Sequence, residues 1–306
     1  MKTSPKLAIV LINYLQDDLT LDCIKSIKNS DYDNIEIILI NQISTKDSEN
    51  KFKSEFPELT FISTEKNIGF ASACNLGIRK ALEDKAEIIC LLNNDTIVLP
   101  DTFSNLIKKF GLSEDVGVVG PKIMYNDNKE KIWFGGGKLL LNKGAKTVHL
   151  DMNKSENEGN NQIKEVDFIT GCALMVKRKG FETVGLLDEK YFAYFEEVDF
   201  CYRVKKAGYK ILYVPQSKLY HKVSSTTHKY FSGLINYYKF RNRLYFLKKH
   251  LPFGQFLLLL PIVFYYSLKE IFISITKGRF KDVISIPLGM IHFIIGRSGE
   301  GPEWLK

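Results

Sequence analysis

Short apolar runs recur through the first hundred residues, and each of them ends in a polar side chain. The runs are Leu7–Asn13 (LAIVLIN), Ile35–Asn41 (IEIILIN) and Glu87–Asn93 (EIICLLN), with a weaker one at Leu59–Ser63. Runs of this length, rich in Ile, Leu and Val, are typical of strands buried on both faces of a parallel sheet. The pattern therefore predicts a sheet.

Apolar residues at helical spacing fill two of the intervals between these runs. One helix is predicted after Asp17 and Asp18, whose negative charges suit a helix N-terminus. Another is predicted after Asn67, whose side chain can cap it. The alternation of strands and helices predicts a doubly wound α/β domain with right-handed crossovers.

Three of the apolar runs end in asparagine, at Asn13, Asn41 and Asn93. Open α/β sheets bind ligands at the carboxyl ends of their strands, so these side chains mark a candidate crevice. Asparagine also favours ordinary turns after strands, and each residue alone fits that explanation as well.

The middle of the chain predicts a less regular region. A helix is expected over Thr102–Phe110, a strand-like run VGVVGPKIMY broken by its Gly-Pro pair, and a further strand over Val166–Val176. The segment Trp133–Asn161 has three consecutive glycines and then a polar loop. It predicts a hairpin with a flap over the site or a surface loop, and both interpretations stay open.

Three carboxylates fall within four residues, at Glu196, Glu197 and Asp199, after an aromatic run and before Arg203. An acid beside apolar rings has a raised pKa and can accept a proton near neutral pH. The same acids also suit the first turn of a helix predicted from Glu196 to Lys206, and isolated clusters of this kind are more often structural.

Two further residues suggest a cation site. Asp95 follows a buried strand directly, where its carboxylate would ligate a hard divalent cation that bridges phosphate oxygens. His221 follows the strand-like run Lys210–Val214, and imidazole suits Mn²⁺-type ions. A turn at Asn93-Asn94-Asp95 and a structural histidine are the alternatives.

The last third of the chain is basic and apolar. Residues 201–306 contain 18 Lys and Arg against 4 Asp and Glu, within a net charge of +8 for the whole chain. Gly233–His250 predicts a basic amphipathic helix, and Leu251–Leu268 has no formal charge but is interrupted by Pro and Gly. This mixture favours an anionic membrane surface over nucleic acid, with segments that lie in the interface rather than span it. A helical oligomer interface is the alternative without a membrane.

The five cysteines are scattered, with no CxxC pair. This spacing indicates neither a disulfide framework nor a cysteine zinc site, and it suits a reducing compartment. The apolar run Leu7–Ile12 is too short for a signal peptide, so we expect a cytoplasmic protein.

Taken in order, these segments resemble the family 2 glycosyltransferases of the GT-A fold, in particular the rhamnosyltransferase-like enzymes of bacterial cell-surface polysaccharide synthesis. Over about residues 6–250 the resemblance rests on IVLINYLQDDLTLDCIKSI, KNIGFASACNLGIRKAL, LLNNDTIV and FITGCALMVKRKGFETVGLLDEKYFAYFEEVDFCYRVKKAGYKILYVPQSKLYH. It implies a Rossmann-like, doubly wound mixed sheet over residues 1–232. The nucleotide-sugar half would cover about 1–100 and the acceptor half about 101–232. Residues 233–306 would form a helical membrane-associating region.

The resemblance also implies an activity. It is that of an inverting, metal-dependent glycosyltransferase that moves a rhamnosyl or hexosyl group from a nucleoside-diphosphate sugar (dTDP-rhamnose or a UDP-sugar) to a hydroxyl of a lipid-linked or polysaccharide acceptor. Mn²⁺ or Mg²⁺ would be held by Asp95 and His221. Glu197 stands where the family usually has Asp and is implied as the base, with Asp199 and Glu196 as alternatives. The expected place is the inner face of the cell membrane, with no nucleic-acid partner and the oligomeric state open.

The resemblance implies a set of residues that contact the donor. They are Asn13, Asn41, Asn67, Gly69, Asn75, Asn93, Asp95 and Arg203. The family usually has Asp-Asn after the second strand, whereas this chain has Asn41-Gln42, which offers amides but no charge. The sugar and nucleotide of the donor therefore stay undetermined.

Two other functions remain open. The altered Asn41-Gln42 pair is the feature that favours a catalytically degenerate member, which binds a sugar nucleotide or a partner protein without turnover. A membrane-surface nucleotidyltransferase would share the sheet and the metal but would not need the acidic cluster.

Overall fold

The computed structural model describes residues 4–222 and 232–305. The strands are β1 (Leu7–Tyr14), β2 (Ile35–Gln42), β3 (Thr60–Thr64), β4 (Ile88–Asn93), β5 (Thr96–Val98), β6 (Val116–Tyr125), β7 (Ile132–Phe134), β8 (Gly137–Leu140), β9 (Lys146–His149), β10 (Lys164–Glu165), β11 (Ala173–Lys177) and β12 (Lys210–His221). The helices are α1 (Asp17–Lys28), α2 (Lys46–Glu55), α3 (Phe70–Glu83), α4 (Thr102–Ile107), α5 (Arg178–Val184), α6 (Glu196–Lys206), α8 (Ser232–His250), α9 (Phe253–Thr276) and α10 (Phe280–Ile294).

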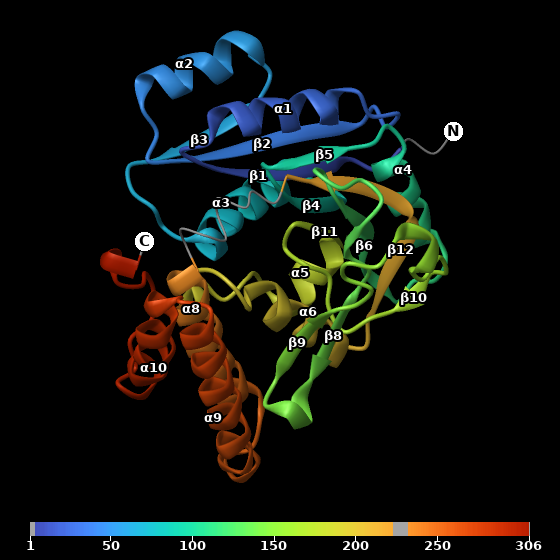
Figure 1. Cartoon of the computed structure of the whole chain (residues 1–306). Coiled ribbons are helices and arrows are strands. Elements are labelled where there is room, and N and C mark those ends of the chain that lie inside the picture. The colour runs from blue at the N-terminus through green and yellow to red at the C-terminus, as the bar shows by residue number, and fades with distance from the viewer. Residues whose placement is uncertain (1–3, 223–231, 306) are drawn as a thin grey trace.

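A mixed sheet forms the centre of the molecule, as Figure 1 shows, with strand order β10-β12-β6-β11-β4-β1-β2-β3. The four apolar runs are its strands β1 to β4, and β1 lies parallel to both β2 and β4. In this register Asn13 is opposite Asn41, and Ile12 is opposite Asn93. The predicted α/β fold is confirmed, and the strand-ending asparagines lie at one edge of the sheet.

Two local predictions were wrong in detail, and one helix was missed. The Gly120-Pro121 pair does not break β6, which runs through it while the facing strand β12 shifts register between Val214 and Lys218. The strand predicted over Val166–Val176 begins only at Ala173, because Gly171 and Cys172 form a turn and Phe168 makes an isolated bridge to Gly137 instead. The polar helix α2, in which only Phe52 is buried, was not predicted because it lacks an apolar stripe.

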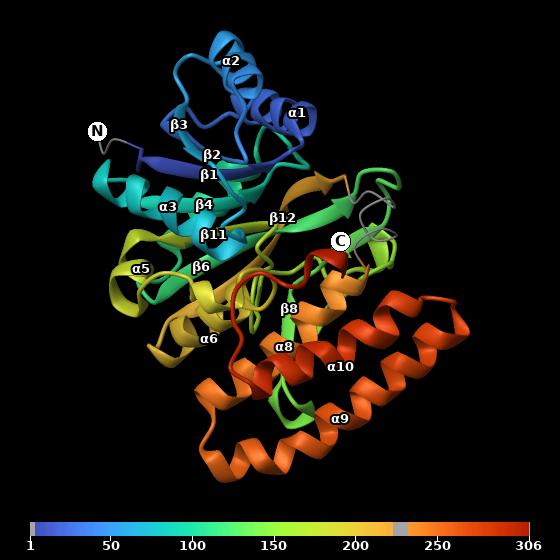
Figure 2. The same ribbon diagram turned by 90° about the vertical axis from the view of Figure 1, so that its left-hand side faces the viewer.

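The segment Trp133–Asn161 contains the β8–β9 hairpin. Arg243 of α8 donates from Nε to the carbonyl of Gly144 at the tip of this hairpin. A Cβ added at Gly144 would lie 2.8 Å from Cγ2 of Val263 in α9. The hairpin therefore packs against the C-terminal helices, as Figure 2 also shows.

The C-terminal helices pack against one another and against the sheet domain. Leu244, Phe246 and Leu247 of α8 belong to the same buried core as the strands. Helix α10 lies close along α8, so that a Cβ added at Gly289 would be 2.5 Å from the carbonyl oxygen of Tyr237. The sheet and α8 therefore share one core.

Helix α9 is unbroken although Pro261 lies inside it, so the interruption predicted in Leu251–Leu268 was wrong apart from Pro252, which precedes the helix. In the described part of the chain it is the one helix long and apolar enough to cross a membrane, with a mean hydropathy of 1.8 and 17% of that window buried. These criteria concern length and composition, which a helix lying along a surface also meets.

Candidate active site

A cavity of about 330 Å³ lies at the carboxyl ends of β1 and β2, where the sequence predicts a crevice. Its lining residues are Asn13, Leu15, Asp17, Asp18, Asn41, Gln42, Ile43, Thr45, Ser48 and Lys51. The carboxyl edge of an open α/β sheet is the usual place for a ligand, so this cavity is the candidate site for a nucleoside.

The asparagines at this edge hold each other in place. The Nδ2 atom of Asn13 donates to Oδ1 of Asn41 at 2.7 Å and to Oδ1 of Asp17 at 2.6 Å. The Nδ2 atom of Asn41 donates to the hydroxyls of Ser44 and Ser48, at 2.8 and 3.0 Å. Both N–H groups of the Asn41 side chain therefore have partners. The base of a nucleoside could accept a hydrogen bond from Asn41 only if it displaced one of the two serine hydroxyls.

The N-terminus of α3 packs against Phe192, in the loop before α6. Helix α3 begins at Phe70, and Oδ1 of Asn67 accepts from the amide of Gly69 at 2.9 Å, so the predicted capping by Asn67 was wrong and its side chain closes a turn instead. Gly69 has φ of +86°, and a Cβ there would lie 2.6 Å from the ring of Phe192. The amide of Ala71 donates to the carbonyl of Phe192 at 3.2 Å.

Asn75 also has partners within the protein. Its Nδ2 donates to the carbonyl of Leu187 at 2.9 Å, and its Oδ1 accepts from the amide of the same residue at 3.0 Å. Nδ2 also donates to Oε1 of Glu189 at 2.9 Å. This buried amide joins α3 to the segment that precedes α6, and these contacts give Asn75 a structural role.

Asp95 and His221 come together because β5 pairs antiparallel with the end of β12, which places Thr96 opposite His221. Oδ1 of Asp95 lies 3.0 Å from Nε2 of His221, without the alignment of a hydrogen bond. Among the described residues, Oδ1 of Asp95 and Nδ1 of His221 are buried without a hydrogen-bond partner. The ring of Trp133 packs edge-on against the imidazole of His221, with centroids 4.5 Å apart.

This pair fits a divalent cation that arrives with a phosphate group. Residues 4–222 and 232–305 contain no group of three or more His, Cys, Asp or Glu side chains that could hold a metal ion. A carboxylate oxygen and an imidazole nitrogen are a donor set for Mn²⁺, and such ions often complete their coordination with substrate phosphates and water. Asp95 and His221 would hold the ion, which would offset negative charge on a leaving diphosphate.

Helix α6 begins at Glu196 and ends at Lys206, where the sequence predicts it. Burial and the neighbouring charge of Glu197 raise the pKa of Glu196 well above its ordinary value. Burial also raises the pKa of Glu197, although hydrogen bonds from backbone amides of the first turn and the charge of Lys239 oppose the rise. Oε2 of each glutamate has no hydrogen-bond partner in the described part of the chain.

Glu197 is the better placed of the two as a base. Glu197 is half-buried, whereas Glu196 is only 4% exposed, so Glu197 is the more accessible to an acceptor. Glu196 faces inward, since a Cβ added at Gly171 would lie 3.9 Å from its Oε1. Cys172, which follows Gly171, accepts a hydrogen bond through its carbonyl from the amide of Asn93 at 2.9 Å. The short turn at Gly171 and Cys172 therefore lies between Glu196 and the end of β4, which leads to Asp95.

Asp199 belongs to a buried charge cluster. Its carboxylate accepts from Nε of Arg203 at 2.8 Å, from Nε2 of His250 at 2.7 Å and from the hydroxyl of Tyr191 at 3.2 Å, and Lys249 lies 2.8 Å away. Burial alone would raise the pKa of Asp199, but the His250 hydrogen bond and the charges of Arg203 and Lys249 hold it well below its usual range. A carboxylate so stabilised in its charged form is a poor proton acceptor.

Arg203 makes its other contacts with the backbone. Its guanidinium donates to the carbonyl of Val184 and, at 2.8 Å, to the carbonyl of Leu186. Asn93 is likewise fixed through its backbone, because its carbonyl accepts from Oγ1 of Thr96 at 2.8 Å. These contacts give Arg203 a role in holding α6 and give no support to the predicted contact with a donor.

Sequence reasoning missed several residues around the site. Burial lowers the pKa of His149 to about 4, which keeps its imidazole neutral, and its ring packs against Trp133 with centroids 5.0 Å apart. On α8, Arg241 and Asn242 are almost fully buried. Arg241 stands four residues after Tyr237 on the apolar face of a predicted helix, and a charge in that position was the available signal.

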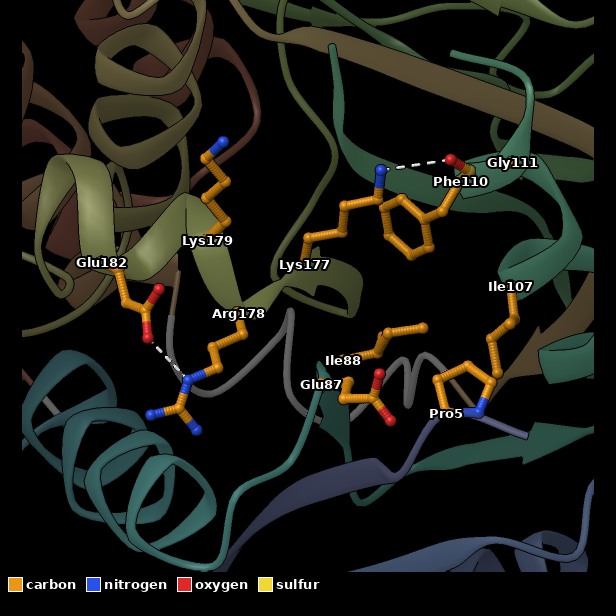
Figure 3. Close-up of a pocket in the computed structure, with 10 residues that line it drawn as sticks. All are labelled: Pro5, Glu87, Ile88, Ile107, Phe110, Gly111, Lys177, Arg178, Lys179 and Glu182. Carbon is orange, nitrogen blue, oxygen red and sulfur yellow. Dashed lines mark hydrogen bonds and ion pairs between the residues drawn. The ribbon is translucent and has the colours of Figure 1, made fainter. Parts of the chain in front are cut away.

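A larger cavity, of about 560 Å³, lies at the opposite edge of the sheet. Figure 3 shows its lining side chains, with Glu87 and Ile88 at the start of β4 facing Lys177 and Arg178 at the end of β11. Strand β4 rises about 3.3 Å per residue, which puts Ile88 roughly 17 Å from Asn93. This cavity is therefore separate from the candidate active site.

The sequence has relatives that transfer sugars. It is 24% identical over 238 residues to the low-salt glycan biosynthesis hexosyltransferase Agl10 of Haloferax volcanii, covering 78% of this chain and 74% of that protein. It is 24% identical to the dTDP-rhamnosyl transferase RfbF of Shigella flexneri, covering 81% and 82%. It is 25% identical to the N-acetylglucosaminyl-diphospho-decaprenol L-rhamnosyltransferase of Mycobacterium tuberculosis, covering 67% and 72%.

Two solved structures share the fold. GalNAc-T7 with UDP, GalNAc and Mn²⁺ has a TM-score of 0.60 at 16% identity over 82% of this chain, which spans about half (52%) of that chain. The mannosyltransferase PcManGT of Pyrobaculum calidifontis, in complex with GDP-Man and Mn²⁺, has a TM-score of 0.59 at 14% identity over 95% of this chain and 74% of that chain.

The model of the family described as "Glycosyl transferase family 2" matches residues 8–185, which is more than half of the chain. That span runs from the second residue of β1 to the end of α5 and includes the loop that carries Asp95. The protein therefore belongs to glycosyl transferase family 2 and is a glycosyltransferase of the GT-A fold.

Proposed function

We propose that this protein is an inverting glycosyltransferase that uses a nucleoside-diphosphate sugar as donor and a lipid-linked or polysaccharide hydroxyl as acceptor. The observation that carries the proposal is the position of Glu197. Its carboxylate has an unpaired oxygen and a raised pKa, and it stands in the first turn of α6. Its neighbour Glu196 lies beside Gly171, in the short turn that Cys172 ties to Asn93 at the end of β4, two residues before Asp95. A rhamnosyl or hexosyl group is the proposed cargo, because the relatives are named for these transfers.

The proposed reaction is a single displacement. The acceptor hydroxyl gives its proton to a carboxylate oxygen of Glu197 while its own oxygen forms a bond to the anomeric carbon of the donor sugar. The bond from that carbon to the diphosphate breaks, and the nucleoside diphosphate leaves with the electron pair. Attack opposite the leaving group inverts the anomeric centre. The raised pKa of Glu197 brings the base closer to the operating pH, which is where general-base catalysis is most efficient.

A panel of donors tests this proposal directly. UDP-, dTDP- and GDP-sugars are each incubated with the protein and Mn²⁺ or Mg²⁺, and the release of nucleoside diphosphate and the binding of each donor are measured. Turnover of at least one donor is expected. Binding without turnover of any donor would support the degenerate, sugar-nucleotide-binding alternative, and absence of binding across the panel would overturn the proposal.

The Glu197→Gln variant tests the base. It keeps the size of the side chain and removes its basicity, so transfer is expected to fall by about 10²–10⁴-fold, the range of general-base effects. Donor binding, measured by calorimetry, is expected to stay near that of the native protein. An equal loss of donor binding would mean that Glu197 serves the donor or metal site instead.

We also propose that α9 and α10 attach the enzyme to the inner face of the cell membrane. Large apolar side chains cover the outer faces of both helices, which project away from the sheet in Figure 2. They are Phe253, Leu257, Leu258, Phe264, Tyr265, Leu268, Phe272 and Ile275 on α9, and Phe280, Ile284, Ile291 and Ile294 on α10. Such a surface within a basic segment suits the headgroup region of an anionic bilayer, where a lipid-linked acceptor would be within reach.

Vesicle sedimentation tests this attachment. The native protein is expected to pellet with vesicles that contain phosphatidylglycerol, and a Leu258→Glu/Phe272→Glu double variant is expected to stay in the supernatant. Leu112→Glu is the matched control, because Leu112 is 59% exposed but lies outside these helices. Pelleting of the double variant would refute the attachment. Extraction by alkaline carbonate distinguishes a helix that lies in the interface, which is released, from one that spans the bilayer.

A further inference from the structure

The loop just before α6 has an unusual backbone. Phe192, Tyr194 and Phe195 have φ values of +65°, +66° and +77°. Residues with side chains reach this left-handed region rarely, because it is sterically unfavourable for them, so surrounding contacts must hold them there. Glu197 follows two residues after Phe195, so the direction of its side chain depends on how firmly this loop is held.

Asn242 of α8 holds the loop through its side-chain amide. Its Nδ2 lies within hydrogen-bonding distance of three carbonyl oxygens, those of Tyr191 at 3.0 Å, Ala193 at 2.8 Å and Tyr194 at 2.7 Å. The carbonyl of Phe192, which is left over, accepts from the amide of Ala71 on α3. Four successive carbonyl groups of the strained loop are therefore bound by other elements.

Arg241 fixes the orientation of this amide. Its Nε donates to Oδ1 of Asn242 at 2.9 Å, which leaves the N–H₂ side of the amide facing the loop. Its guanidinium also donates to the carbonyl of Tyr191 at 2.9 Å and to the carbonyl of Gly299 at 2.7 Å. Asn242 is 1% exposed and Arg241 is 2% exposed, so water does not compete for these hydrogen bonds.

Helix α8 also holds the residues that follow the base. Lys249 and His250, at its C-terminal end, contact Asp199 at 2.8 and 2.7 Å. Helix α8 therefore holds the chain on both sides of Glu197, through Arg241 and Asn242 before it and through Lys249 and His250 after it.

We propose that Asn242, oriented by Arg241, is a positioning residue for Glu197, which it aims at the acceptor by holding residues 191–194 in their strained conformation. This rests on the proposed function, in which Glu197 accepts the proton of the acceptor. An amide N–H₂ suits the position because three carbonyl oxygens converge on it. A carboxylate there would repel them, and an aliphatic group would leave them buried without donors.

Steady-state kinetics of the full-length protein, with the donor that the panel identifies, tests the proposal. Asn242→Ala is expected to lower kcat of sugar transfer by about 10²-fold, because a misplacement of about 1 Å is enough for such a loss. The Kd of the donor, measured by calorimetry, is expected to change less than about twofold, since the residue acts on the base and not on the donor. Asn236→Ala is the control, because Asn236 lies on the same helix and takes no part in these hydrogen bonds.

Two further measurements separate positioning from a merely structural role. The Asn242→Ala/Glu197→Gln double variant is expected to be no slower than Glu197→Gln alone, because both changes remove the same catalytic contribution. The acid limb of the pH profile of kcat/KM is expected to move to lower pH in Asn242→Ala, since a released Glu197 is better solvated. Additive losses, or an unchanged kcat for the folded protein, would overturn the proposal.

Asn242→Ser covers the case in which the alanine variant does not fold. It adds no charge and keeps one hydroxyl donor, but it removes the N–H₂ group that serves three carbonyl oxygens, so a loss of kcat in the same direction is expected. The two proposals fail differently. Full activity of Glu197→Gln would refute the assignment of Glu197 as the base, whereas an inactive Glu197→Gln together with a fully active Asn242→Ser would refute the positioning role alone.

Discussion

Replacement of Asp199 by Asn tests whether this carboxylate is a structural anchor or a catalytic base. The native side chain is fully buried and accepts from Arg203, His250 and Tyr191, with Lys249 alongside. Asn keeps the shape and some hydrogen bonds but cannot neutralise the two permanent cations. Loss of one partner from a buried ion pair costs about 3–5 kcal/mol.

The lower end of that range applies here, because the side chains of Arg203 and Lys249 are 19% and 27% exposed and can be partly rehydrated. We therefore expect a loss of about 3 kcal/mol in the free energy of unfolding. The entropy of unfolding is about 2.1 cal/mol/K per residue, so for 306 residues this corresponds to a fall in Tm of about 5 °C.

Thermal unfolding followed by circular dichroism measures this fall. Glu182→Gln is the matched control, since Arg178 and Glu182 also form an arginine–carboxylate pair four residues apart but are 35% and 52% exposed. Exposed pairs of this kind contribute about 0.3–0.5 kcal/mol, or less than 1 °C in a chain of this size. If Asp199→Asn lowers Tm no more than Glu182→Gln, the anchor assignment is refuted. The same holds if Tm is unchanged while transfer is abolished.

The pH dependence of the same measurement has a definite sign. The pKa of Asp199 is depressed in the folded protein, so its contribution is complete above the unfolded pKa of about 3.9 and is lost as pH falls towards the folded value. The advantage in Tm of the native protein over Asp199→Asn should therefore shrink as the pH is lowered through the acid range.

Three other predictions concern the site. Gly69→Ala should lower Tm and transfer together, because its φ of +86° is unfavourable for alanine and the added Cβ would lie 2.6 Å from the ring of Phe192; Gly254→Ala, at an open position, is the control, and equal effects of the two changes would contradict the close packing. The acid limb of kcat/KM should lie above the ordinary pKa of a glutamate, because Glu197 must lose its proton to act and its pKa is raised; a limb near pH 4 would argue against this assignment. His221→Ala should weaken the Mn²⁺-dependent part of donor binding in calorimetry while binding without metal, measured in EDTA, is unchanged; an unchanged Mn²⁺ dependence would remove His221 from the metal site.

The parts of the fold that local pattern determines could be predicted from the sequence. Apolar runs predict strands β1 to β4, and an acidic first turn with a basic last turn predicts α6. The Asp95–His221 pairing also agrees with the set expected from the family resemblance. The capping role predicted for Asn67 was wrong because its side chain closes the turn before α3, while the distant carbonyl of Phe192 accepts from the amide of Ala71 in the first turn of the helix.

The architecture around the base depends on contacts that no local pattern reveals. Asn242 and Tyr191 are 51 residues apart in the sequence. The side-chain N–H₂ group of Asn242 donates to the loop before α6, and nothing in the aromatic sequence of that loop indicates a distant donor. The predicted domain boundary at residue 232 was based on the change in composition. Helix α8 lies beyond that boundary, yet its buried side chains donate hydrogen bonds to the strained loop before α6. Truncation after His250, intended to release the protein from membranes, would have a second effect. It would delete Gly299, whose carbonyl accepts from Arg241, and α10, which packs along α8.

The position of α8 in the chain has a consequence for biosynthesis. The sheet is complete once β12 ends at His221, but the donors that fix the catalytic loop are translated 48 to 51 residues after the carbonyls they bind. Ribosomes add about 5–20 residues per second, so the strands of the sheet leave the ribosome about one to four seconds before Asn242 does. Under the proposed mechanism, Glu197 would be present but not yet positioned during that time, and activity would begin only after the C-terminal helices have left the ribosome.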